Sequence, residues 1–228
     1  MTRAQLIAAT ALLAVVAATS GDERRAAALD KVAEAPRALT LDALLARFRV
    51  IPGLSARYRE EKHIALLAEP LVSEGTVHFA PPRRIARHAL VPSPSSVVYD
   101  GASLRFGDGA TEQRIDVGAS PVVRAFVDSF ASVLAGDRSA LDRSFVVDFL
   151  ASDAVHPDRW ELSLVPRSAE LLAILREVRF AGDGVVVARM VVREATGDEG
   201  VTTFSAVDAA HPYSSAEAAR VFRVSGGS

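Results

Sequence analysis

The chain has 228 residues, with 26 Lys and Arg against 28 Asp and Glu, a formal net charge of −2, and no Cys. A chain of this length with 50% hydrophobic residues forms one soluble globular domain or at most two small ones. The near balance of charge argues against a nucleic-acid partner. The lack of Cys excludes disulfides, thiolate metal sites and a Cys nucleophile.

The N-terminal 20 residues carry a single charge at Arg3, followed by an apolar run from residue 6 to residue 18. This order is typical of a secretory signal peptide, and the small residues before position 19 favour cleavage near Ala18. We therefore expect residues 1–20 to be a signal peptide and the mature protein to be secreted. A signal anchor is the alternative, because the charged, Ala-rich leader at 21–39 could continue the same helix.

A first helix is expected after Thr40, which can cap it, because the apolar residues up to Phe48 recur at helical spacing. Between residues 54 and 117 the pattern shortens to several antiparallel strands. Asp100-Gly101 and Asp108-Gly109 are typical of hairpin turns between them.

The clearest helix is expected over residues 121–135, where Pro121 follows Ser120 and an apolar stripe runs to Leu134 before Gly136. Strands then resume, with one short helix near 168–175. The total is roughly eleven strands and three helices. We interpret residues 40–224 as a single domain, a mainly β protein (α+β) whose one antiparallel sheet is curled and covered by helices. The later strands are expected at 145–150, 160–165, 178–180, 185–192 and 201–207.

Catalytic and cofactor motifs are missing from the sequence. Gly101-Ala102-Ser103-Leu104-Arg105 lacks the second Gly of a nucleophile elbow and is better explained as a hairpin turn. The five His residues are too widely spaced to pair as metal ligands on one element. We expect no enzyme activity, no catalytic residues, no metal and no cofactor.

Large apolar residues of the predicted helices and strands form the candidate ligand-binding set. They could fill an ordinary core, or they could line a cavity for an acyl chain, because a sheet of about eleven strands is too wide for its own side chains to fill. The set consists of Leu44, Phe48, Tyr58, Phe79, Ile85, Val98, Leu104, Phe126, Phe130, Leu134, Trp160, Leu162 and Leu164. Of these, Phe126, Phe130 and Leu134 share the stripe of the best-defined helix.

The order of several segments resembles the LolA family of periplasmic outer-membrane lipoprotein carriers. These segments are LDALLARF at 41–48, SARYREEK at 55–62, SEGTVHFAPPRRIAR at 73–87 and the Asp100-Gly101 dipeptide, followed by the Pro121 helix. The resemblance spans about residues 40–222. It implies an incomplete, curled antiparallel β-barrel with an α-helical lid. Its apolar interior would bind the acyl chains of a lipoprotein, taken from an inner-membrane donor complex to an outer-membrane acceptor.

Two residues depart from the family pattern. Pro81 replaces the basic residue that holds the family's lid closed, and Arg87 replaces an aromatic residue. We therefore expect a divergent, monomeric carrier closed by apolar contact, with Arg83, Arg84 or Arg87 as candidates for a substitute polar latch. The alternatives are a carrier of a non-protein lipid or polyene product of a biosynthetic gene cluster, a lipid or glycan hydrolase, and a structural protein without ligand.

Overall fold

The computed structural model describes residues 39–224, with gaps at 109, 120 and 152–154. The predicted signal peptide at 1–20 and the leader at 21–39, except for Leu39, lie outside the described residues.

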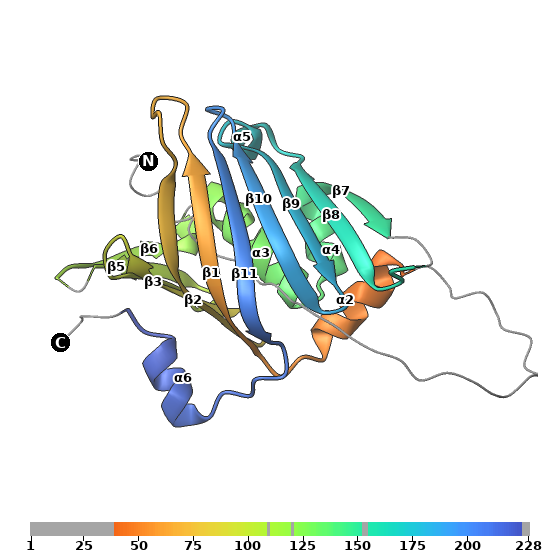
Figure 1. Ribbon diagram of the computed structural model, residues 1–228, viewed down its shortest axis with the longest axis horizontal. Coiled ribbons are helices and arrows are strands. Elements are labelled where there is room, and N and C mark those ends of the chain that lie inside the picture. Colours follow the sequence, from red (N-terminus) through yellow and green to blue (C-terminus); the bar gives the residue numbers. More distant parts are fainter. Residues whose placement is uncertain (1–38, 109, 120, 152–154, 225–228) are drawn as a thin grey trace, which may run out of the picture.

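The described residues form one antiparallel sheet of eleven strands in the order β6-β5-β4-β3-β2-β1-β11-β10-β9-β8-β7 (Figure 1). The first six strands and the last five are each consecutive meanders, and the pairing of β1 with β11 joins them. Strands β6 and β7 are the two edges, so the barrel is incomplete, as predicted. The strands are β1 (Leu54–His63), β2 (Leu71–Ala80), β3 (Arg84–Val91), β4 (Ser95–Tyr99), β5 (Ser103–Gly107), β6 (Glu112–Asp116), β7 (Phe145–Ala151), β8 (Arg159–Pro166), β9 (Leu175–Asp183), β10 (Val186–Glu194) and β11 (Glu199–Asp208).

Helices α2 (Leu41–Arg49), α3 (Pro121–Leu134) and α4 (Arg138–Ser144) lie on one side of the curved sheet (Figure 1). Helix α2 begins as predicted, because the Thr40 hydroxyl accepts a hydrogen bond from the Ala43 amide at 3.2 Å. Its Phe48 ring packs edge-on against Trp160 of β8, with 6.2 Å between the ring centroids. Apolar residues of these helices and of the facing strands form the main hydrophobic core.

The C-terminal helix α6 (Ser215–Val221) lies on the other side of the sheet (Figure 1). There Phe222 and Val224 pack against Ala80, Ala86 and Val98 in a second, smaller apolar cluster. The prediction that Val98 belongs to the candidate ligand-binding set inside the sheet is therefore wrong. Both of its neighbours in SVVY are also apolar, so the sequence did not indicate the face. The register pairs Val98 with Ala86 and turns Tyr99 inward.

Two helices, α4 and α6, were not predicted, whereas β6 lies where the sequence predicted a strand after the Asp108-Gly109 turn. Both helices have little apolar signal, since Leu141 is the buried residue of α4 and α6 has none. The helix expected at 168–175 is shorter, since α5 spans Ala169–Leu172 and β9 already starts at Leu175. The short 3-10 helix η1 (Val117–Ala119) leads from β6 towards α3.

Candidate functional site

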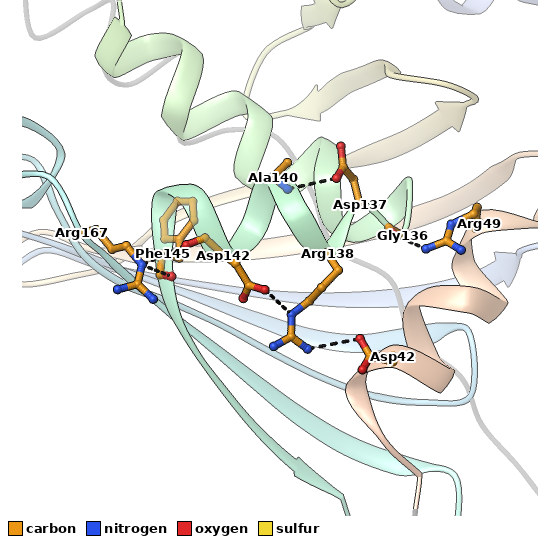
Figure 2. Close-up of polar contacts among 9 residues, drawn as sticks. All are labelled: Asp42, Arg49, Gly136, Asp137, Arg138, Ala140, Asp142, Phe145 and Arg167. Atoms are coloured by element: carbon orange, nitrogen blue, oxygen red, sulfur yellow. Dashed lines mark hydrogen bonds and ion pairs between the residues drawn. The ribbon is translucent and has the colours of Figure 1, made fainter.

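Polar side chains tie the helices to one another and to the sheet (Figure 2). The Arg49 guanidinium donates to the Gly136 carbonyl at 3.0 Å, and Arg138 contacts Asp42 of α2 and Asp142 of α4. From the turn before β3, Arg83 Nη2 donates to Asp137 Oδ2 at 3.0 Å. Of the three candidate arginines it is Arg83 that reaches the helices, and closure mainly by apolar contact stays a prediction.

A cavity of about 680 Å³ opens on the inner face of the sheet over strands β1 to β6. This volume lies within the range of about 300–1,000 Å³ typical of small-molecule sites. The described residues that line it belong to strands and turns, and no helix residue whose side chain the structure describes is among them: Glu60, Lys62, Pro70, Leu71, Val72, Ser73, Arg87, Ala89, Pro92, Ser93, Ser95, Ser96, Val97, Phe106, Gly107, Asp108, Thr111 and Gln113.

A buried ion pair lies at the cavity wall, where β1 and β3 face each other across β2. Arg87 Nη2 lies 2.5 Å from Glu60 Oε2 and 3.2 Å from the Ser73 hydroxyl. The guanidinium also stacks over the Tyr58 ring, 4.1 Å from its centroid. The Tyr58 hydroxyl is 3.1 Å from Ser73 Oγ, and burial raises the pKa of this hydroxyl. These contacts fix the guanidinium in one orientation.

A second buried pair joins Lys62 to Glu194 of β10, with 2.6 Å between Nζ and Oε1. The side chains of Lys62 and Glu194 are 14% and 9% exposed, so water screens them little. The charged residues that line the cavity are Glu60, Lys62, Arg87 and Asp108, two of each sign. The cavity wall is thus polar in places but electrically balanced.

The predicted ligand-binding residues lie elsewhere. Twelve of the thirteen meet in the main core, Val98 lies in the second cluster, and none of them lines the cavity. Phe130, for example, packs edge-on against Phe126 and Phe180, with ring centroids 5.0 and 6.0 Å apart. The set therefore comes together as packed core, and its contact with a ligand stays a prediction.

The charged cavity residues were missed, although the strand pattern contained a signal for them. Tyr58 faces inward, so the alternation along β1 places Glu60 and Lys62 on the same face. Pairing of Glu60 with Arg87 could not be predicted, because it depends on the registers of β1 with β2 and of β2 with β3.

Ser103, the residue nearest to a nucleophile motif, has a structural role. Its hydroxyl donates to Asp100 Oδ2 at 2.8 Å, while Asp100 Oδ1 accepts from the amides of Ala102 and Ser103. Gly101 adopts a φ of 94° in the same turn. This geometry favours the predicted hairpin turn over a catalytic serine.

The part of the chain that the structure describes holds no cluster of three His, Asp or Glu residues arranged to bind a metal. None of its helices has the length and apolarity to span a membrane.

Fold and site together define a class of protein: an open, curled antiparallel sheet with helices over one part of its inner face and a ligand-sized cavity over another. The chain belongs to the family described as outer membrane lipoprotein carrier protein LolA-like, whose model matches residues 33–224. Among curated proteins, none has a sequence that matches it.

Solved structures with similar folds are distant in sequence. The LolA superfamily protein NE2245 from Nitrosomonas europaea is 11% identical with a TM-score of 0.40, and the match covers 75% of this chain and 94% of that one. A chain of the MucA/MucB complex of Pseudomonas aeruginosa is 13% identical with a TM-score of 0.44, and the match covers 74% of this chain and 56% of that one. A putative outer membrane lipoprotein-sorting protein domain from Vibrio parahaemolyticus is 8% identical with a TM-score of 0.39, covering 72% and 88%.

Proposed function

We propose that this protein is a periplasmic carrier that binds the acyl chains of a lipoprotein or lipid and moves them from the inner to the outer membrane. The observation that carries the proposal is the cavity of about 680 Å³ on the inner face of the sheet, in a chain of the LolA-like family. Leu71, Val97 and Phe106 give this cavity apolar surface. Each buried methylene of a ligand contributes about 0.8 kcal/mol, so one acyl chain supplies several kcal/mol of affinity.

The same proposal assigns no covalent chemistry to the protein. Ser103, the residue on which a hydrolase would most plausibly depend, caps a turn through Asp100. Binding and release would then be the whole function. An inner-membrane donor and an outer-membrane acceptor would be the partners, and the carrier would act as a monomer without cofactor.

Native mass spectrometry of the protein purified from its own periplasm tests this function. We expect an adduct whose mass identifies either an acylated lipoprotein or a free lipid, and the adduct distinguishes the two cargoes. Ligand-free protein that also fails to bind an acyl-chain probe in solution would contradict the carrier function. Cleavage of acyl esters that depends on Ser103 would support the hydrolase alternative instead.

A further inference from the structure

The electrostatics of the cavity wall point to a chemical class of ligand. We propose that the cavity selects uncharged, ester-linked acyl chains over free fatty acids, and that Glu60 sets this selectivity. This inference rests on the proposed carrier function and names its substrate class.

Each cationic side chain that lines the cavity is already paired with a carboxylate. Arg87 is paired with Glu60 at 2.5 Å, and Lys62 is paired with Glu194 at 2.6 Å. The Arg87 and Glu60 side chains are 7% and 11% exposed, so their charges interact in a medium of low dielectric. A ligand carboxylate that approached Arg87 would lie beside the Glu60 carboxylate. Like charges in such a site oppose each other strongly, which disfavours an ionised ligand.

An uncharged hydrogen-bond acceptor, such as an ester carbonyl, is not repelled by the Glu60 carboxylate. Of the Arg87 guanidinium nitrogens, Nη2 donates to Glu60 and Ser73, and the Tyr58 hydroxyl is a further partner of the guanidinium. The guanidinium carries more N–H groups than these partners occupy. Because Arg87 lines the cavity, the guanidinium can donate to an ester carbonyl there. The hydroxyls of Ser93 and Ser95 lie on the same cavity wall and can donate as well. An acyl ester therefore adds hydrogen bonds to the pair without adding charge.

The remaining surface suits the hydrocarbon part of such a ligand. Pro70, Leu71 and Pro92 line one part of the cavity, and Val97 and Phe106 line another. The site thus combines apolar walls with one fixed hydrogen-bond donor, the usual composition of a site that orients an amphipathic ligand.

The test uses two fluorescent probes with the same polyene tail, parinaric acid and its methyl ester, titrated into the full chain at pH 8, where the acid is ionised. We expect the wild-type protein to bind the ester about tenfold more tightly, a difference of about 1.4 kcal/mol. Glu60→Gln keeps a hydrogen-bond acceptor for Arg87 but removes the negative charge. It should reverse the order and favour the acid about tenfold.

The matched control is Glu61→Gln, the same substitution one residue along β1, on the outer face where Glu61 pairs with Arg59. It should leave the ratio of the two affinities unchanged. Equal binding of both probes by the wild-type protein, or tighter binding of the acid, would overturn the selectivity while leaving the carrier function intact. Binding of neither probe would overturn both. The wild-type ratio needs no variant, so the test stands even if Glu60→Gln does not fold.

A competition arm separates the two natural sources of acyl esters. Displacement of the bound methyl ester by dioleoylglycerol would support a glycerolipid ligand, and displacement by a triacylated cysteinyl peptide would support a lipoprotein. Failure of both competitors to displace the ester would contradict the assignment to natural acyl esters.

Discussion

Arg83 connects the turn between β2 and β3 to the helices. Its guanidinium reaches Asp137, the N-cap of α4, but both side chains are about one-third exposed. Partly exposed ion pairs contribute little to stability, because water and salt screen them. We therefore see this contact as a tie between the β2–β3 turn and the helices and not as a strong latch.

Removing that tie should have a small effect. We expect Arg83→Ala to lower the free energy of unfolding by about 0.2–1 kcal/mol. The release rate of an acyl ester probe should stay within about twofold of wild type, because strand and turn residues line the cavity. Arg84→Ala is the control, since Arg84 lies over Phe222 on the other face of the sheet. Strongly faster release by Arg83→Ala alone, in stopped-flow fluorescence, would make Arg83 a latch and place the ligand beneath the helices.

His78 makes the second apolar cluster sensitive to acid. Its Nδ1 lies 2.9 Å from the Tyr213 hydroxyl, and its Nε2 lies 3.1 Å from Thr76 Oγ1. Burial, followed by the nearby His88 and His211, lowers the pKa of His78 to about 4, while Glu217 opposes the shift. Between these two pKa values, His78 is protonated in the unfolded chain, where its pKa is about 6.5, but stays neutral in the folded protein. The stabilisation that neutral His78 contributes is therefore complete above about pH 6.5 and is lost as the pH falls towards 4.

Urea unfolding at pH 7 and pH 4.5 measures this effect. We expect the wild-type protein to lose about 2 kcal/mol more than His78→Gln over this interval, after a discount for partial exposure of the ring. Equal losses in the two proteins would show that folding does not lower the pKa of His78.

At the scale of elements, the junction of α2 with the end of α3 depends on Gly136. This residue has a φ of 64°, and a Cβ added to it would lie 2.2 Å from the Leu45 carbonyl oxygen. It therefore combines a left-handed backbone with a close approach of two helices. The contact between Arg49 and the Gly136 carbonyl lies at the same place (Figure 2).

Gly136→Ala should therefore cost more than the backbone strain alone, which is about 1–2 kcal/mol. Gly184→Ala isolates that strain, because Gly184 has a φ of 54° and nothing within 4 Å of the added Cβ. We expect Gly136→Ala to be the more destabilised of the two by at least about 1 kcal/mol in chemical denaturation. Equal destabilisation of the two variants would mean that α2 moves away from Gly136 and accommodates the added Cβ without further cost.

Phe130 of helix α3 tests whether the apolar stripe of this helix is packed core or contacts the ligand. Phe130 is 1% exposed and packs against two other rings. We expect Phe130→Ala to lower the free energy of unfolding by about 3–5 kcal/mol. The protein that remains folded should still bind the ester probe. Loss of probe binding by folded Phe130→Ala protein would show instead that the α3 stripe contacts the ligand.

The sequence predicted the elements that bury alternating or helical apolar faces, because burial requires that pattern. Strand β1 and helix α3 are examples. It did not indicate α4 or α6, which carry few buried residues, or the face of Val98, whose neighbours are also apolar. The site was harder to predict. A charged residue on a strand usually indicates a solvated face, and the three-strand register that buries Glu60 against Arg87 is a tertiary property.

At the scale of the whole molecule, the two parts of the inner face differ in what covers them. Helices α2, α3 and α4 pack on the inner face with the apolar core, whereas the described side chains that line the cavity over β1 to β6 come from strands and turns. We propose that this cavity, and not the interior beneath the helices, holds the ligand. Filling it should then abolish binding without unfolding the protein.

Ser95→Trp is the variant that tests this claim, because Ser95 lines the cavity at the start of β4. The matched control is Leu90→Trp, since Leu90 is 65% exposed and does not line the cavity. The measurement is the affinity for parinaric acid methyl ester, with the thermal unfolding midpoint recorded for each protein. We predict that Ser95→Trp weakens binding at least tenfold while Leu90→Trp does not. Unchanged affinity in a folded Ser95→Trp protein would contradict the account.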